Sequence, residues 1–206
     1  MKKEYSLITL RKKDVKENPI EQFKQWMDEA VEAEILEANA ISLATSTSEG
    51  KPSVRTVLIK SVNDRGIVFF TNYESRKAQD IKENPFAAMS IWWKEMERQV
   101  CIEGSIEKIS REESEEYFNT RSRGSRIGAW TSKQSSVLGS REELEGKYSS
   151  IEKKYPGEEI PAPPFWGGYL LNPTSMEFWQ GRPKRLHDRI LYTRKNGSWE
   201  ICRLSP

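Results

Sequence analysis

The first periodic segment of the chain has the spacing of a helix. Its apolar side chains recur at helical intervals: Ile20, Phe23, Met27, Ala30 and Val31. Asn18 and Pro19 stand directly before them, and Asn at a cap with Pro in the first turn favours a helix start. The pattern therefore predicts a helix over residues 19–36 that packs one face on a core.

Beyond residue 40, apolar residues alternate with small or polar ones, which is the period of a strand. The alternation predicts strands at 40–46, 53–61, 67–71, 86–93, 99–109, 167–171, 175–180, 189–194 and 198–203. Asn196 and Gly197 favour a tight type I′ turn between the last two. We therefore expect a mostly antiparallel meander that forms a small β-barrel.

Capping residues mark further helices in the sequence. They predict helices from Ser75 to about Lys82, from Ser110 to about Asn119 and from Ser140 to about Lys154. Residues 1–17 are highly charged, and we expect them to form a mobile arm. Residues 18–206 are expected to form a single domain of the mostly β (α+β) class with flanking helices.

The composition narrows the class of protein. The chain has 33 Lys and Arg against 31 Asp and Glu among 206 residues, a formal net charge of +2. A nucleic-acid-binding protein normally carries a strong basic excess, so no nucleic-acid partner is expected. Cys101 and Cys202 lie far apart and form no zinc-like spacing. Because no apolar run suits a signal peptide or a membrane span, we expect a cytoplasmic protein without membrane contact.

Three segments have candidate anion-binding groups. The loop from Thr71 runs into the helix near Ser75, where Arg76 and Lys77 stand in the first turn. Free N–H groups and two cations in one place favour a phosphate, which would also compensate cations that oppose the helix dipole. A surface helix start with unfavourable charge placement is the alternative.

The second candidate segment holds Tyr117, Arg121 and Ser125. Tyr117 and Arg121 are four residues apart, so on a continuous helix they share a face and form a phosphate site with Ser125. Three arginines around Gly124 are also the composition of an RNA-contacting loop, although no wider basic field supports that alternative.

The third segment runs from Arg55 to Lys60 on a predicted strand. Side chains alternate along a strand, so these two cations point to opposite faces unless a twist or bulge intervenes. A solvated lysine at a strand end is the alternative for Lys60.

The only histidine, His187, stands in a dense stretch from Glu177 to Arg189. A hairpin would bring the functional groups of this stretch together: two arginines, an imidazole, a carboxylate and a tryptophan. Such a set can bind a planar anionic ligand. Asp188 adjoins His187 and points away from it on a strand, so no Ser-His-Asp triad is expected. With one histidine and no ligand cluster, no metal site is expected either.

Several motifs occur together in one order: residues 55–60 (RTVLIK), 70–72 with 75–77 (FTN, SRK), 97–100 (ERQV), 127–130 with 132–136 (IGAW, SKQSS), 163–168 (PPFWGG), and 177–180 with 185–189 (EFWQ, RLHDR). This order resembles the pyridoxine (pyridoxamine) 5′-phosphate oxidase family over nearly the whole chain. The last motif is close to diagnostic. The resemblance implies an FMN-binding split β-barrel that forms a homodimer with FMN at the subunit interface.

The resemblance also implies an activity. Pyridoxamine 5′-phosphate and pyridoxine 5′-phosphate would be oxidised to pyridoxal 5′-phosphate, a step of vitamin B6 biosynthesis and salvage. Hydride would pass from C4′ of the substrate to flavin N5, and O₂ would reoxidise the flavin and give H₂O₂. The cofactor supplies the redox chemistry, and the protein orients and polarises the substrate.

Site residues follow from the same resemblance. The implied FMN contacts are Arg55, Thr56, Val57, Leu58, Ile59, Lys60, Phe70, Thr71, Arg76, Lys77, Gln99, Gln134, Ser135, Trp179 and Arg189, with Arg76 and Lys77 on the phosphate. The implied contacts of the substrate phosphate are Lys60, Tyr117, Arg121 and Ser125. Arg185 and His187 would form the catalytic pair over the pyridine ring, and whether either moves a proton stays open.

Two positions depart from the commoner family pattern. Phe70 stands where a tyrosine is frequent, and Lys2 replaces an arginine that, with Tyr5, closes over the substrate in some relatives. A non-catalytic flavin- or pyridoxal-phosphate-binding split barrel is the alternative to an enzyme. The intact set from Arg185 to His187 argues against it.

Overall fold

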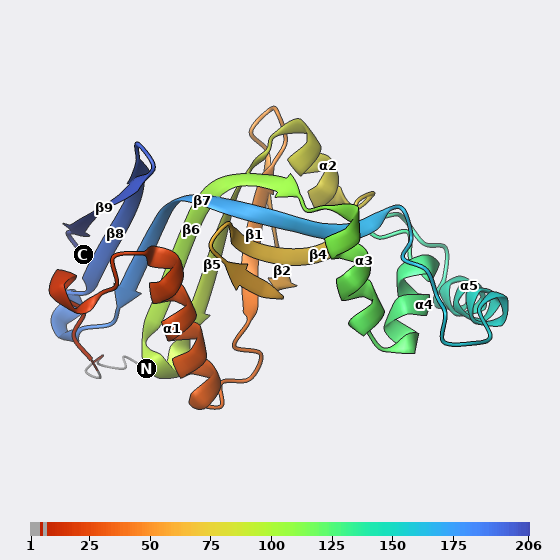
Figure 1. Ribbon diagram of the computed structural model, residues 1–206, viewed down its shortest axis with the longest axis horizontal. Helices are drawn as coiled ribbons and strands as arrows, with labels where there is room; N and C mark the ends of the chain where they lie inside the picture. Colours follow the sequence, from red (N-terminus) through yellow and green to blue (C-terminus); the bar gives the residue numbers. More distant parts are fainter. Residues whose placement is uncertain (1–4, 6–7) are drawn as a thin grey trace.

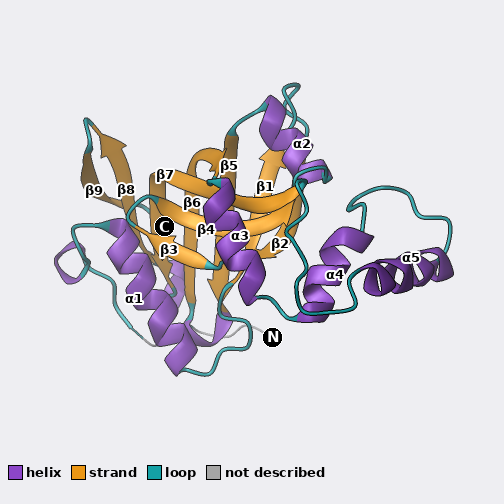
Figure 2. Ribbon diagram, turned by 45° about the vertical axis from the view of Figure 1, so that its right-hand side comes forward, coloured by secondary structure: helices purple, strands orange, loops and turns teal. Residues whose placement is uncertain are grey.

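Nine strands form one antiparallel, strongly curved sheet in the computed structural model, which describes residue 5 and residues 8–206 (Figure 1, Figure 2). The strands are β1 (Ala40–Ser46), β2 (Pro52–Leu58), β3 (Ser61–Asn63), β4 (Gly66–Asn72), β5 (Phe86–Trp93), β6 (Arg98–Lys108), β7 (Trp166–Gln180), β8 (Asp188–Lys195) and β9 (Ser198–Leu204). Their order is β2-β1-β5-β6-β7-β4-β3, and β8 pairs with β7 and β9. The predicted class, mostly β with flanking helices, is confirmed.

Four of the five α-helices begin where the capping residues predict, and α4 is the exception. The helices are α1 (Pro19–Glu32), α2 (Arg76–Glu83), α3 (Arg111–Thr120), α4 (Arg123–Thr131) and α5 (Arg141–Lys154), with short 3₁₀ turns η1 (Lys12–Asp14), η2 (Lys94–Met96) and η3 (Pro183–Arg185). The Asn18 side chain accepts from the N–H of Ile20 at 2.9 Å. Ser110 and Glu113 form a reciprocal capping box at the start of α3.

The long strand β7 divides the molecule into two parts. One edge of β7 pairs with β6, while the other edge pairs first with β4 and then with β8. The barrel strands and the β8–β9 hairpin are therefore joined through one strand. Figure 1 shows the hairpin at one end of the long axis and α4 and α5 at the other, with α3 between them and the barrel.

The prediction of one continuous strand over residues 53–61 was wrong, because the structure divides this segment between β2 and β3. β2 pairs with β1, whereas β3 pairs with β4. The chain therefore changes its partner strand between β2 and β3. The N–H of Ile59 donates to Asn39 O, and the N–H of Lys60 donates to Val68 O, each at 2.9 Å. The change resets the alternation of side chains, so Arg55 and Lys60 do not have to face opposite sides.

Other predicted boundaries were wrong for identifiable reasons. Strands 167–171 and 175–180 form the single strand β7, because Pro173 lies opposite Gly104 at a register shift of β6, where its missing N–H is tolerated. Helix α4 was not predicted, since Gly124 and Gly128 weaken its pattern. Helix α1 ends at Glu32 instead of residue 36.

The barrel interior forms the main hydrophobic core, and a smaller cluster lies beneath α3 and α4. Gly167 allows α3 to lie close to β7, because a Cβ there would be 2.9 Å from Ser114 Oγ. The Ser114 hydroxyl of α3 accepts from the N–H of Gly168 at 3.2 Å. Phe118, Ile127 and Trp166 are buried in the smaller cluster.

Residues 8–17 of the expected arm are hydrogen-bonded to the C-terminal part of the chain. The N–H of Leu10 donates to Asp188 Oδ2 at 3.0 Å, and Leu10 O accepts from Arg203 at 2.7 Å. The Tyr192 hydroxyl donates to Lys16 O at 2.6 Å. Lys2 lies outside the described residues.

Candidate functional site

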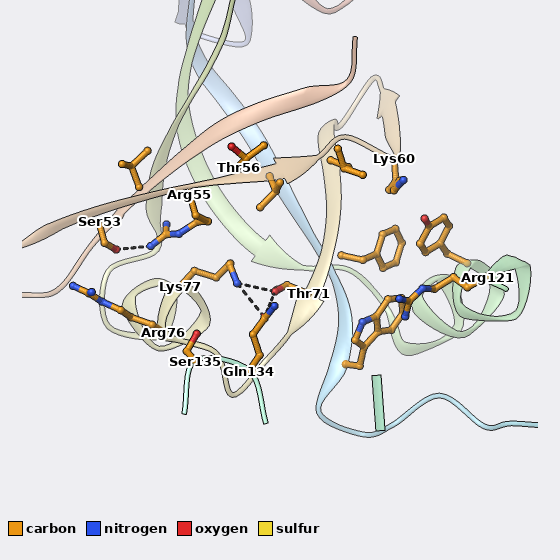
Figure 3. A pocket seen from close by; sticks show the side chains of 16 residues that line it. Ser53, Arg55, Thr56, Lys60, Thr71, Arg76, Lys77, Arg121, Gln134 and Ser135 are labelled. Carbon is orange, nitrogen blue, oxygen red and sulfur yellow. Dashed lines mark hydrogen bonds between the residues drawn. The ribbon is translucent and has the colours of Figure 1, made fainter. Parts of the chain in front are cut away.

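A cavity of about 610 Å³ opens between β2, β4, α2 and α3 (Figure 3). Its lining residues are Ser53, Val54, Arg55, Thr56, Val57, Leu58, Lys60, Phe70, Thr71, Arg76, Lys77, Tyr117, Arg121, Gln134, Ser135 and Trp166. Figure 3 shows Arg55, Arg76 and Lys77 toward one end and Lys60 and Arg121 toward the other. The cavity therefore has two cationic ends, and its size suits a small-molecule ligand.

At the first end, Arg55 is held by a closed ring of hydrogen bonds. Its guanidinium donates to Thr45 Oγ1 at 2.7 Å and to Ser53 Oγ. Both hydroxyls donate in turn to Asp80 Oδ2, at 2.6 and 2.7 Å. The directions are fixed because a guanidinium only donates and a carboxylate only accepts. Burial is the main cause that lowers the pKa of Arg55.

Lys77 lies beside this ring and carries a buried charge. Its ammonium donates to Thr71 Oγ1 at 3.1 Å, to Ser75 Oγ at 3.2 Å and to Gln134 Oε1 at 3.1 Å. Burial, and then the charge of Arg55, lower the pKa of Lys77 to about 8. All three acceptors are neutral, so this end of the cavity favours an anion.

The second end is built from stacked rings. The rings of Phe70, Tyr117 and Trp166 lie nearly parallel, and the Phe70 centroid is 4.0 Å from that of Tyr117 and 5.3 Å from that of Trp166. The Arg121 guanidinium lies 4.8 Å from the Trp166 centroid, as a cation–π contact. Arg121 Nη1 is buried and has no hydrogen-bond partner among the described residues. An unpaired buried donor of this kind favours a ligand acceptor.

Ser125 does not line this cavity. It lines a neighbouring cavity of about 340 Å³, which shares Phe70, Thr71, Arg121, Gln134 and Trp166 with the first. Helix α3 ends at Thr120, so Tyr117 and Arg121 are not on one continuous helix. Arg121 is the residue that follows the helix, and it still reaches the same cavity as Tyr117.

Three predicted flavin contacts form a row across another part of the sheet. The strand register places Gln99 opposite Trp179 and Trp179 opposite Arg189. Glu177 binds Arg189 through two hydrogen bonds of 2.7 and 2.9 Å, and it raises the pKa of Arg189. Trp92 continues the row on β5, opposite Gln99.

The loop between β7 and β8 holds Arg185 and His187. Lys184 and Arg185 have left-handed backbone conformations, with φ of 58° and 62°. Each such residue costs roughly 1 kcal/mol, and strain of this kind is often found at functional sites. His187 packs on Trp179 with centroids 4.5 Å apart, and Tyr5 packs edge-on to both rings. Arg185 is exposed.

The predicted site residues therefore fall into two groups within one chain. The cavity group lies between the barrel and the helices. The second group, Gln99, Trp179, Arg185, His187 and Arg189, lines none of the cavities that contain the first. Ile59 belongs to neither, because its side chain is buried in the barrel core, so only its backbone is available for a flavin.

Some residues of the site were not predicted. Ser53 stands two positions from Arg55, and strand alternation is a signal that places both on one face. Trp166 lies in the quoted 163–168 motif, without a role assigned to it. Thr45 and Asp80 carry no sequence signal, because only the fold brings them behind Arg55.

Comparison with known proteins identifies the family. Residues 27–155 match the family model described as pyridoxamine 5′-phosphate oxidase. Residues 166–206 match the pyridoxine 5′-phosphate oxidase C-terminal dimerisation region. The chain belongs to the pyridoxamine 5′-phosphate oxidase family. The predicted family is thereby confirmed, and so is the prediction of an oxidoreductase.

Curated relatives are similar over the full chain. The pyridoxine/pyridoxamine 5′-phosphate oxidase of Nostoc punctiforme is 53% identical and that of a Cyanothece strain is 50% identical; each alignment covers 100% of this chain and 97% of the relative. The Paraburkholderia phymatum protein of the same name is 53% identical, with the same coverage.

Solved structures confirm the predicted split-barrel fold. PhzG from Burkholderia lata, solved with tetrahydrophenazine-1-carboxylic acid, has a TM-score of 0.93 at 31% identity and covers 99% of this chain and 100% of its own. A pyridoxamine 5′-phosphate oxidase-related, FMN-binding protein from Nostoc punctiforme has a TM-score of 0.72 at 20% identity, covering 89% and 97%. The second likeness concerns the fold alone.

Two kinds of feature are absent from residues 5 and 8–206. No helix among them combines the length and apolar character needed to cross a membrane. Residues 5 and 8–206 also contain no group of three or more His, Cys, Asp or Glu side chains placed to hold a metal ion.

Proposed function

We propose that the protein binds FMN and oxidises pyridoxamine 5′-phosphate and pyridoxine 5′-phosphate to pyridoxal 5′-phosphate. The observation that carries the proposal is the cavity with two separate cationic ends, one at Arg55 and Lys77 and one at Lys60 and Arg121. Two phosphorylated molecules held side by side need two such ends. The names of the relatives at 50–53% identity support this choice of ligands.

FMN fits the first end. Arg55, Arg76 and Lys77 would hold its phosphate, where Lys77 carries a charge that no acidic hydrogen-bond partner balances. Residues 55–58 with Phe70, Thr71, Gln134 and Ser135 would line the ring system. When bound, FMN would take a hydride from C4′ of the substrate at N5 and pass two electrons to O₂, giving H₂O₂.

The substrate phosphate fits the second end. Arg121 presents a buried, unpaired N–H group, and Tyr117 and Lys60 line the same cavity. Ser125 would contribute from the adjoining cavity, which shares Arg121. Phe70 lacks the hydroxyl that is frequent in the family, and its stack on Tyr117 gives it a packing role instead.

A second copy of the chain would complete each site. Arg185, His187, Trp179, Gln99 and Arg189 stand outside the cavity of their own chain, so we infer that they face the cavity of a partner. The outer face of β2 and β5 exposes Val54, Phe86 and Trp92 by 70%, 61% and 42%, which is typical of a protein interface. The dimerisation region at 166–206 supports this arrangement.

In such a dimer, Arg185 and His187 would bind the ring substituents of the substrate and orient C4′ toward the flavin. Tyr5 packs on His187 and Trp179 and would help to exclude water from this side. Positioning is therefore the main contribution of the chain, since the cofactor supplies the redox step.

Three alternatives predict different behaviour. A non-catalytic split barrel would bind flavin without turnover. The likeness to PhzG favours a test with a reduced phenazine carboxylic acid, although the relatives at higher identity bear the vitamin B6 name. The third alternative is an RNA-contacting loop, but two of its arginines already form ion pairs within the chain, Arg123 with Glu152 and Arg126 with Glu158.

The test is an absorbance spectrum of the purified protein with added FMN, followed by oxidase assays. We expect flavin bands, and consumption of O₂ with H₂O₂ release on addition of pyridoxamine 5′-phosphate or pyridoxine 5′-phosphate. Absence of flavin bands after FMN is added would falsify the proposal. Bound flavin without turnover of either substrate would favour the non-catalytic alternative.

A further inference from the structure

The structure fixes which nitrogen of His187 carries a proton. The backbone N–H of Arg182 lies 3.1 Å from His187 Nδ1 and donates to it. A backbone amide can only donate, so Nδ1 must be the acceptor. In the neutral imidazole the proton is therefore on Nε2.

The Arg182 amide is itself held in place on both sides. Next to it along the chain, the N–H of Gly181 donates to Glu97 O at 2.7 Å. The Arg182 side chain donates to Ile8 O at 3.1 Å and forms an ion pair of 3.5 Å with Asp188. Asp188 also accepts from Arg203 at 2.6 Å. The Arg182 N–H, which donates to Nδ1, therefore lies in a loop that hydrogen bonds and an ion pair hold in place, so it keeps its orientation toward the ring.

The surroundings of the ring favour its neutral form. His187 packs against Trp179 and Tyr5. Burial, and then the charge of Arg185, lower the pKa of His187. The carboxylate of Asp188, the first residue of β8, is engaged by Leu10, Arg182 and Arg203.

We propose that His187 acts as a hydrogen-bond donor through Nε2–H, toward an oxygen substituent of the substrate's pyridine ring, and not as a proton acceptor. This role rests on the proposed function, whereas the tautomer itself does not. To accept a proton, the neutral ring would have to use Nδ1 and break its hydrogen bond to the Arg182 amide. The proton released on oxidation of the alcohol or amine therefore does not pass to His187.

Because the chain has one histidine, the tautomer can be read without assignment. The experiment is a long-range ¹H–¹⁵N spectrum of the FMN-loaded protein, labelled with ¹⁵N-histidine, at neutral pH. We expect an acceptor-type shift for Nδ1 and an N–H-type shift for Nε2. A protonated Nδ1, or two averaged shifts, would overturn the proposal.

Two substitutions test the donor role. In His187→Gln the side-chain amide can reach the position that Nε2–H has in the wild type. In His187→Asn the shorter side chain places the amide nearer to the position of Nδ1. We expect kcat/KM for pyridoxamine 5′-phosphate to fall about tenfold more in His187→Asn than in His187→Gln, the effect of one lost hydrogen bond to a charged acceptor. Equal losses in both, with a pH limb that only wild type shows, would identify a base and overturn the proposal.

Failure of the two proposals is distinguishable. If the wild-type protein oxidises neither phosphorylated substrate while the spectrum shows Nε2–H, the proposed function fails and the tautomer stands. If turnover is normal but the proton is on Nδ1, the proposed function stands and the donor role fails.

Discussion

Two arginines of the proposed site are held in opposite ways. Arg55 lies in a closed ring in which Thr45 and Ser53 link it to the buried carboxylate of Asp80. Arg185 is exposed, stands on a left-handed backbone, and forms no hydrogen bond through its side chain to any described residue. The contrast teaches that one chain alone fixes Arg55 in place, whereas Arg185 has no fixed contact with the described residues of its own chain, which is the basis for our proposal that a partner chain completes the site.

The largest expected effect tests whether the two regions act across two chains. Arg121→Ala and Arg185→Ala should each lower kcat/KM about 100-fold, since each removes hydrogen bonds from a charged group. A purified heterodimer of the two variants should regain about half of the wild-type turnover, because one of its two symmetric sites combines two intact halves.

The reciprocal heterodimer is the matched control. It pairs a wild-type chain with a chain that carries both substitutions, so each of its sites has one damaged half and it should stay inactive. Sites confined to single chains would give the reverse result, with activity in this control and none in the first heterodimer.

The second test separates flavin binding from turnover. Arg76→Ala should weaken FMN binding about tenfold through the loss of a phosphate contact, whereas Arg185→Ala should lose turnover and keep its flavin. Fluorescence titration of FMN gives both affinities. Equal flavin loss in the two variants would mean that the division of the site is wrong.

The third test uses the charge of Lys77. Its folded pKa is about 8, below the ordinary 10.5, so the ammonium is charged below pH 8 and loses its proton above it. FMN affinity should therefore fall as the pH rises from 8 to 10, by up to about tenfold per unit for one coupled proton. Riboflavin has no phosphate, and its affinity should show a much smaller slope; equal slopes for both would contradict a phosphate role.

The smallest expected effect concerns the support of Arg55. In Asp80→Asn the amide oxygen can still accept from Thr45 and Ser53, because both hydroxyls bind the same Oδ2. The loss of charge should lower the free energy of unfolding at pH 7 by about 1 kcal/mol.

The pH dependence of the free energy of unfolding is a second check on Asp80→Asn. The pKa of Asp80 is lowered, against the effect of its burial, by the hydroxyls of Thr45 and Ser53 and by Arg55. The stability that it contributes is present above pH 3.8 and is lost as the pH falls through the folded value. Urea unfolding of Asp80→Asn should therefore vary less with pH below 4 than that of wild type, and an unchanged slope would exclude this role.

The local elements of the fold were largely predictable from the sequence. Asn18, Ser75 and Ser110 mark helix starts because capping is a short-range interaction. Strands β1 and β5 have the predicted bounds, since alternation and turn residues define them. Helix α4 was missed because its contacts in the cluster of Phe118 and Trp166 outweigh the cost of Gly124 and Gly128.

The site was predictable from the sequence only in part. Motif resemblance named most residues that line the cavity, including Arg121 and Gln134, which are far apart from Arg55 in sequence. The ring through Thr45 and Asp80 was not predictable, because it depends on the distance between β1 and α2. The break at Ile59 and Lys60 was not predictable either, since it depends on which strands pair.

The position of β7 has a consequence for how the protein is made. This strand of 15 residues is inserted between β6 and β4, yet it is synthesised after all the other barrel strands. A nascent chain on the ribosome therefore exposes the unpaired edges of β4 and β6 until Gln180 has emerged, and the hairpin with His187 and Arg189 follows later still. Long-range pairing of this kind folds slowly and is prone to misassembly. The interval before residues 166–180 have emerged is therefore the one in which a chaperone would have most to protect.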